Sequence, residues 1–175
     1  MRVTIVLSAV LAAATLAGCA QQSEPGNAAT PAPTNGAAPQ AGMRGDEPAD
    51  SASAKAAREL VERYFAMIDK RDYAGAYRLW GNGGKDAGGT VEQFAETFAI
   101  YSKYEPQAGV ATEIHAREGM QYVLVTAKAH VENKKTRKTA DREGTVMLRR
   151  STNPDDPVAE KRDWRIWGVD LRVPS

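Results

Sequence analysis

The residue with the clearest chemistry is Cys19, the single cysteine among 175 residues. A lone thiol rules out an internal disulfide framework and any zinc site built from several cysteines. Arg2 and an uncharged apolar run, residues 3–16, precede it, and two glutamines follow shortly after it. This order is typical of a secretory signal, and the run is shorter than the about 20 residues of a membrane-spanning helix. An uncleaved membrane anchor is the alternative interpretation of the same run.

The four residues Leu16-Ala17-Gly18-Cys19 resemble the lipobox of bacterial lipoproteins. The resemblance implies that residues 1–18 are a signal peptide, that the Cys19 thiol receives diacylglycerol, and that the new amino terminus is acylated, for example with palmitate. It further implies a lipid-anchored protein of the cell envelope. The residue directly after the cysteine is Ala20 rather than an aspartate, which favours attachment to the outer membrane, facing the periplasm. We therefore expect the protein to bind the membrane through the acyl chains on Cys19.

The segment after the lipobox has the composition of a tether. Residues 20–52 contain no Val, Ile, Leu or aromatic residue and hold five of the nine prolines. Such a chain cannot bury enough apolar surface to offset the entropy lost on ordering. We therefore predict that residues 19–52 are the acylated cysteine and a disordered Ala/Pro/Gly-rich tether, and that residues 53–175 form one domain.

Apolar spacing predicts the elements of this domain. Steps of three and four residues indicate a helix over about 54–70, a short helix after Asp72, and a third helix that starts at Thr90 and includes Tyr101. After Gly109 the apolar period becomes two, which indicates about four strands, with Glu132 to Arg142 as a hairpin tip between two of them. Helices followed by a meandering sheet predict an α+β fold.

The motif from Tyr64 to Trp80 (YFAMIDKRDYAGAYRLW), followed by a helix and long strands, resembles the NTF2-like superfamily. That superfamily includes ketosteroid isomerases and SnoaL-like cyclases. The resemblance implies a cone in which three N-terminal helices pack on a curved antiparallel sheet of about four strands and enclose a pocket. It also implies a homodimer through the sheet face, which agrees with apolar residues on both faces of the later strands. It implies no particular activity, because the fold hosts many functions.

The residues expected to line this pocket are Tyr64, Trp80, Tyr101 and Asp170. Asp170 shares a face with Trp164 and Ile166 if the strand period is regular, and the phenol of Tyr64 could act with it in proton transfer. Alternatively, Tyr64 is core packing and Asp170 pairs with Arg172 at the sheet end. No complete acid–base set is recognisable, so we assign no catalytic residue. A non-catalytic binding or interaction module is favoured, with a partner protein, an envelope polymer or a small apolar ligand as its target. An isomerase- or dehydratase-like enzyme acting on a small apolar substrate is the alternative.

The remaining polar residues suggest few partners. The net charge of +1 argues against nucleic-acid binding. His115 and His130 lack a third ligand at a suitable spacing, so neither a metal nor a cofactor is predicted. Basic residues gather at the expected hairpin tip, where they face either solvent, an acidic partner or an anionic membrane leaflet. These residues are Lys134, Lys135, Arg137 and Lys138.

Overall fold

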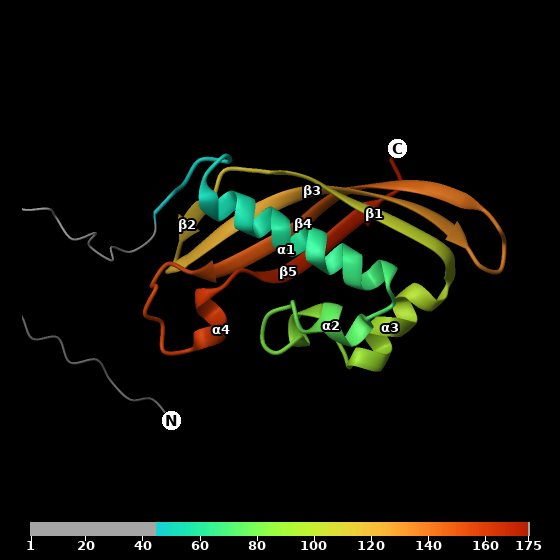
Figure 1. Ribbon diagram of the computed structural model, residues 1–175, viewed down its shortest axis with the longest axis horizontal. Helices are drawn as coiled ribbons and strands as arrows, with labels where there is room; N and C mark the ends of the chain where they lie inside the picture. Colours follow the sequence, from blue (N-terminus) through green and yellow to red (C-terminus); the bar gives the residue numbers. More distant parts are fainter. Residues whose placement is uncertain (1–44, 175) are drawn as a thin grey trace, which may run out of the picture. The chain divides into compact units, whose positions relative to one another are not determined.

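The computed structural model describes residues 45–174. The predicted signal peptide, Cys19 and most of the predicted tether lie outside the described residues. Figure 1 shows helices at the start of the described part and strands after them. The helical elements are α1 (Ala52–Asp69), α2 (Tyr73–Tyr77), the 3₁₀ turn η1 (Lys85–Ala87), α3 (Val91–Ala99) and α4 (Ala159–Arg162), and the strands are β1 (Tyr101–Ala111), β2 (His115–Arg117), β3 (Met120–Asn133), β4 (Thr139–Ser151) and β5 (Arg165–Arg172).

The strands form one open antiparallel sheet in the order β1-β3-β4-β5, with β2 also paired to β3. The two central strands, β3 of 14 residues and β4 of 13, make a long hairpin whose turn lies at the opposite end of the sheet from β2 (Figure 1). The α+β prediction is thereby confirmed. Within the described residues the sheet has five strands rather than about four, and the short helix α4 was not expected.

The strand that the sequence did not predict is β1. The third helix was expected to include Tyr101, but α3 ends at Ala99 and the chain continues as β1. The Thr90–Gln93 capping box at the start of α3 is present as expected. Pro106 had suggested an end to regular structure, yet a proline is tolerated on an edge strand, where its missing N–H breaks no ladder. β1 occupies that edge.

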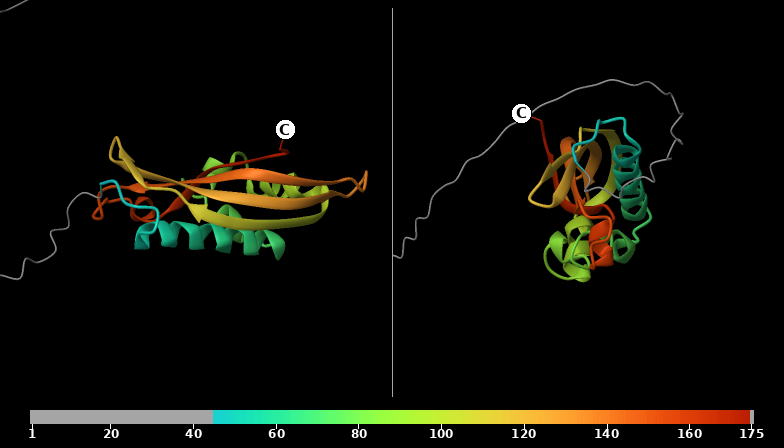
Figure 2. Two further views of the ribbon diagram at one scale, coloured as in Figure 1. Left: turned by 90° about the horizontal axis from the view of Figure 1, so that it is seen from above. Right: turned by 90° about the vertical axis from the view of Figure 1, so that its left-hand side faces the viewer.

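The core lies between α1 and one face of the sheet, and Figure 2 shows α1 running along that face. The apolar residues of α1 recur at steps of three and four, so they lie on one side of the helix, and this side faces the sheet. Four fully buried sheet residues pack on that side. The rings of Trp80 and Phe94, with centroids 6.3 Å apart, fill the space towards α2 and α3. Trp164 lies instead at the start of α1, where its indole N–H donates to the carbonyl of Ser53 at 3.1 Å. These core residues include Leu60, Val61, Tyr64 and Phe65 of α1, Val123, Val125, Val146 and Leu148 of the sheet, and Trp80, Phe94 and Trp164.

The described domain begins earlier than composition suggested. Glu47 and Ile114 exchange backbone hydrogen bonds of 3.1 and 2.8 Å. The Gln121 side-chain amide donates to the carbonyl oxygen of Gly45 at 2.6 Å, and Ser51 caps the first turn of α1. Residues 45–51, assigned by composition to the tether, therefore hold one end of the sheet. They do so through polar contacts, which cannot be predicted from the spacing of apolar residues. We name residues 45–51 the strap.

Candidate ligand-binding groove

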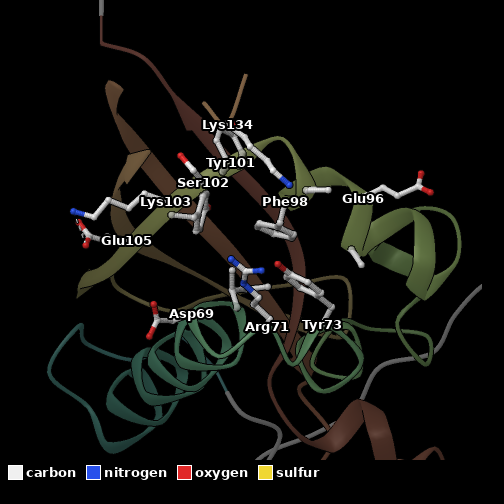
Figure 3. Close-up of a pocket in the computed structure, with 14 residues that line it drawn as sticks. Asp69, Arg71, Tyr73, Glu96, Phe98, Tyr101, Ser102, Lys103, Glu105 and Lys134 are labelled. Atoms are coloured by element: carbon white, nitrogen blue, oxygen red, sulfur yellow. Dashed lines mark ion pairs between the residues drawn. The ribbon is translucent and has the colours of Figure 1, made fainter. Parts of the chain in front are cut away.

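An open groove of about 710 Å³ lies where the C-terminal end of α1, the first residue of α2, α3 and the start of β1 meet (Figure 3). This volume lies in the range typical of small-molecule sites. Its apolar and aromatic lining includes Ile68, Tyr73, Phe98, Tyr101 and Tyr104. Its charged lining comprises Asp69, Arg71, Glu96, Lys103, Glu105 and Lys134.

Aromatic rings form a continuous row along the groove. Tyr73 and Phe98 stack with centroids 5.5 Å apart and planes at 12°. Phe98 meets Tyr104 edge to face at 5.2 Å, and Tyr104 lies 5.6 Å from Tyr101. All four rings are half-buried, so each packs on the domain with one part and leaves another part accessible. Such a row offers a flat apolar surface to a ligand.

Two cations face this row. Arg71 follows α1 in a left-handed conformation, with φ 61°, and its backbone N–H donates to the carbonyl of Ile68 at 2.9 Å. This turn carries the Arg71 side chain off the helix axis and towards the groove. Lys134, from the hairpin turn, is fixed by its backbone N–H, which donates to the carbonyl of Ile100 at 2.8 Å. Figure 3 shows the Arg71 guanidinium, the Lys134 amine and the Tyr73 hydroxyl pointing into the groove.

The acidic residues of the groove do not neutralise these two cations. Glu105 is paired with Lys103 at 2.8 Å at one side of the groove, and Glu96 points away from the groove (Figure 3). Among residues 45–174, no carboxylate lies within ion-pair distance of the Arg71 or Lys134 side chain. The groove therefore combines an aromatic wall with two cations that have no ion pair, and the third acid of its lining, Asp69, has none among residues 45–174 either.

The phenol of Tyr104 is kept neutral in this setting. Burial, together with the neighbouring Tyr101, raises the pKa of Tyr104 to about 12, although the positive charge of Arg142 acts in the opposite direction. A phenol with so high a pKa remains protonated near neutral pH. Tyr104 can hydrogen-bond a ligand, but it is a poor general base.

The predicted pocket residues fall in three different places. Tyr101 lines the groove. Tyr64 and Trp80 lie in the core, edge to face at 6.2 Å, and burial raises the pKa of Tyr64 far above its ordinary value. Asp170 is half-exposed on β5 and accepts a hydrogen bond from Arg172 at 2.7 Å. The structure brings none of Tyr64, Trp80 and Asp170 into the groove.

A bulge explains the position of Asp170. Met147 pairs with Gly168, but the next residue of β4, Leu148, pairs with Ile166, so Trp167 is an extra residue in β5. Because alternate residues of a strand point to opposite faces, one extra residue reverses the pattern beyond it. Ile166 is buried in the core, whereas Asp170, opposite Thr145, lies on the outer face. The expected shared face of Asp170 and Ile166 is therefore wrong.

The remaining predicted residues are at the surface. Lys134 lines the groove, and Lys135, Arg137 and Lys138 are exposed in the β3–β4 turn. His130 is paired with Asp141 at 2.7 Å. Across residues 45–174, no three His, Cys, Asp or Glu side chains gather as a metal site would require. In the same residues, no helix is both long and apolar enough to span a bilayer.

Sequence reasoning missed Arg71, Tyr73, Phe98 and Tyr104 as groove residues. Each belongs to a different element or turn. In the sequence, each was explained by its position at the end of a helix, on the apolar face of a helix, or in a loop. The one usable signal was the alternation Tyr104, Pro106, Ala108, which pairs with Val131, Ala129 and Ala127 of β3. That alternation would have identified β1 and placed Tyr104 beside Tyr101.

No known family model matches the sequence. No curated protein matches it either. Among solved structures, an NTF2-like superfamily protein from Salmonella enterica serovar Typhimurium is 15% identical over 70% of this chain and 94% of that chain, with a TM-score of 0.48. A function-unknown protein from Mycobacterium tuberculosis is 13% identical over 69% and 71%, with a TM-score of 0.47. A protein from Kribbella flavida is 10% identical over 70% and 91%, with a TM-score of 0.45. None of these descriptions names a ligand or an activity.

Proposed function

We propose that this chain is a lipid-anchored envelope protein whose NTF2-like domain is a non-catalytic binding module for a small amphipathic anion. The observation that carries the proposal is the groove, in which two cations without an ion pair in the described part of the chain, Arg71 and Lys134, face a row of aromatic rings. The lipobox-like residues Leu16 to Cys19 support the anchor, and residues 20–44 supply the tether.

The groove favours a ligand with a flat apolar body and one negative group. The apolar body would lie on the accessible parts of Tyr73, Phe98 and Tyr101, where ring contacts are worth about 0.5–1.5 kcal/mol each beyond area burial. The negative group, a carboxylate, sulfonate or phosphate, would lie between Arg71 and Lys134. A planar guanidinium binds such oxyanions through two parallel hydrogen bonds, which fixes the orientation of the ligand.

The enzymatic alternative, an isomerase- or dehydratase-like activity, gains no support from the arrangement of its candidate residues. The phenol of Tyr64 is in the core beneath the sheet, and the carboxylate of Asp170 is on the outer face, paired with Arg172. Proton transfer needs the acid and the base within hydrogen-bond reach of the same substrate. These two groups do not meet that condition.

A homodimer through the outer sheet face belongs to the same proposal. Trp167 is 47% exposed there and lies edge to face with Tyr122 at 5.9 Å, and Leu124 is 40% exposed. Charged pairs such as Lys128 with Glu143 border this patch. An apolar centre with a polar border is the composition of many protein interfaces.

The anchor has its own test. The full chain should fractionate with membranes and extract into detergent, and Cys19→Ala should release the processed protein into the soluble envelope fraction. Acyl chains add about 0.8 kcal/mol per buried CH₂ group, so two or three chains make attachment effectively permanent. A Cys19→Ala protein that stays in the membrane after removal of residues 1–18 would contradict the anchor.

The groove is tested with a probe of the proposed chemistry, anilinonaphthalene sulfonate, by calorimetric titration of the chain from Ala20 onward. We expect one saturable site that weakens about tenfold or more in Arg71→Gln, because a charge-assisted hydrogen bond is worth about 1.5–3 kcal/mol. Arg63→Gln, which removes an exposed cation of α1 outside the groove, is the matched control. Equal affinities for the wild type, Arg71→Gln and Arg63→Gln would contradict the site.

A further inference from the structure

The turn between β3 and β4 is a rigid, strongly basic projection. The side-chain oxygen of Asn133 accepts hydrogen bonds from the backbone N–H groups of Lys135 and Thr136, both at 2.9 Å. The backbone N–H of Asn133 in turn donates to the carbonyl of Lys138 at 2.9 Å. These bonds fix the backbone of the turn, so its exposed lysine side chains start from defined positions. We name residues 133–138 the basic turn.

Most of the charge on the basic turn has no acidic partner. Arg137 is paired with Glu132 at 2.8 Å. No carboxylate among residues 45–174 lies within ion-pair distance of the Lys134, Lys135 or Lys138 amines. Three lysines held together without counter-charges repel one another, and an anionic surface relieves that repulsion.

An apolar side chain accompanies these lysines. Ile100, between α3 and β1, accepts a hydrogen bond from the Lys134 backbone N–H at 2.8 Å and is 53% exposed. It does not line the groove. Exposed lysines next to an exposed aliphatic residue are a combination that binds the interface of an anionic bilayer, where the amines meet headgroups and the apolar group enters the acyl boundary.

We propose that the basic turn and Ile100 dock on a bilayer surface containing anionic phospholipid headgroups. For its setting, this inference rests on the proposed lipid anchor. Because Lys134 belongs to both the basic turn and the groove, docking would place the groove beside the membrane surface. The groove could then receive an amphipathic anion directly from the bilayer interface.

The proposed tether is long enough for this arrangement. The strap lies near β2, at the other end of the sheet from the basic turn (Figure 1). The 14 residues of β3 span about 46 Å at about 3.3 Å per residue. Residues 20–44, at about 3.1 Å per residue in an extended polyproline conformation, reach roughly 80 Å. A chain anchored at Cys19 can therefore bring the basic turn to the same membrane.

The tether itself is a poor alternative occupant of the basic turn. Between residues 20 and 44 it carries one acidic residue, Glu24, and one basic residue, Arg44. The next acids along the chain, Asp46 and Glu47, are already hydrogen-bonded to the sheet. The tether thus offers no acidic segment to match three lysines, whereas an anionic leaflet offers many negative charges.

The test measures binding of the chain from Ala20 onward, which lacks acyl chains, to phospholipid vesicles by co-sedimentation. We expect binding to vesicles that contain phosphatidylglycerol, little binding to pure phosphatidylcholine vesicles, and weaker binding at high salt. The double variant Lys135→Gln/Lys138→Gln should bind about 25-fold more weakly, from about fivefold per lysine. Ile100→Ser should weaken binding severalfold. The double variant Lys55→Gln/Arg63→Gln removes equal charge from α1 and should bind as the wild type does.

The inference is overturned if the chain does not bind phosphatidylglycerol vesicles, or if the two double variants bind equally well. Its failure is separable from failure of the proposed function. Lys135→Gln/Lys138→Gln leaves Arg71, Lys134 and the aromatic row in place, so binding of anilinonaphthalene sulfonate should be unchanged. Vesicle binding lost with probe binding kept supports docking by the basic turn. Membrane attachment through Cys19 is measured separately, in the full chain.

Discussion

Removing the Glu47 carboxylate should weaken the attachment of the strap to the sheet. This carboxylate accepts hydrogen bonds from Arg150 at 3.2 Å and from Gln121 at 3.0 Å. The Arg150 side chain is 9% exposed, and its guanidinium carbon lies 4.3 Å from the centroid of the Trp164 ring. The guanidinium also donates a hydrogen bond of 2.7 Å to the Ser53 hydroxyl oxygen. Glu47→Ala leaves a buried guanidinium with one acceptor fewer.

The magnitude follows from the two lost contacts. Hydrogen bonds that involve a charged group contribute about 1.5–3 kcal/mol each, and the Glu47 side chain retains 27% of its exposure to water. Solvent screening lowers the total, so we expect about 3 kcal/mol of destabilisation. For a domain of this size that corresponds to a fall in Tm of about 10 °C, at roughly 3–4 °C per kcal/mol.

Urea unfolding followed by circular dichroism measures this loss, with Glu113→Ala as the matched control. Glu113 is an exposed glutamate next to Ile114, and no hydrogen bond or ion pair of its side chain is found among the described residues. Its removal should change stability by less than about 0.5 kcal/mol. If Glu47→Ala is as stable as Glu113→Ala, the Glu47 carboxylate does not hold the strap to the sheet, and the contacts with Arg150 and Gln121 are refuted.

The stability difference between wild type and Glu47→Ala also depends on pH. Burial alone would raise the pKa of Glu47, but hydrogen bonds from Ser53 and Gln121 and the charge of Arg150 outweigh it, so the pKa lies below 4.5. A depressed pKa gives stability that is fully present above the unfolded value and is lost as the pH falls through the folded value. The stability difference between wild type and Glu47→Ala should therefore be constant near neutral pH and shrink below about pH 4.5. A difference that grows on acidification would contradict this.

Three further predictions concern the sheet and the groove. Gly144→Ala should destabilise the domain by about 1–3 kcal/mol in urea unfolding, because the new Cβ would overlap the backbone carbonyl oxygen of Asp170. The control Gly45→Ala should be neutral, because a Cβ there meets no neighbouring atom. Equal stabilities of the two variants would contradict the β4–β5 register. Wild type should lose stability between about pH 10 and 12 relative to Tyr104→Phe, because a phenol whose pKa is raised to about 12 favours folding only while protonated. Urea unfolding midpoints of the two proteins are compared at pH 8 and pH 11. If both midpoints fall equally between these pH values, burial of the phenol is contradicted. Trp167→Ser should convert a dimer to a monomer in sedimentation equilibrium, whereas Val110→Ser, 70% exposed, should not; a monomeric wild type would contradict the proposed dimer.

Local periodicity was a sound guide wherever one face of an element is buried. The repeat from Ala57 to Ile68 predicted α1 within about two residues at its start, because burial against the sheet enforces that spacing. The capping box of α3 and the basic turn were likewise readable, since each depends on residues close in sequence. Prediction failed where the structure depends on a partner distant in sequence.

Three failures illustrate that dependence. β1 exists because β3 pairs with it, and Pro106 concealed the strand. The bulge at Trp167, invisible in a period of two, moved Asp170 to the outer face. The groove draws Arg71 from a turn and Lys134 from a hairpin, 63 positions later in the chain. No local pattern announces that two such residues face one aromatic row.

The central claim, that the groove is the ligand site, is tested most directly by mapping where a ligand binds. Anilinonaphthalene sulfonate, titrated into the isotope-labelled chain from Ala20 onward, should shift backbone amide NMR signals at Arg71, Tyr73, Phe98 and Lys134 in a saturable way. Signals of the core and of the outer sheet face, such as Val125 and Trp167, should stay in place. Saturable shifts centred on Trp167, or no saturable shift at all, would contradict the account.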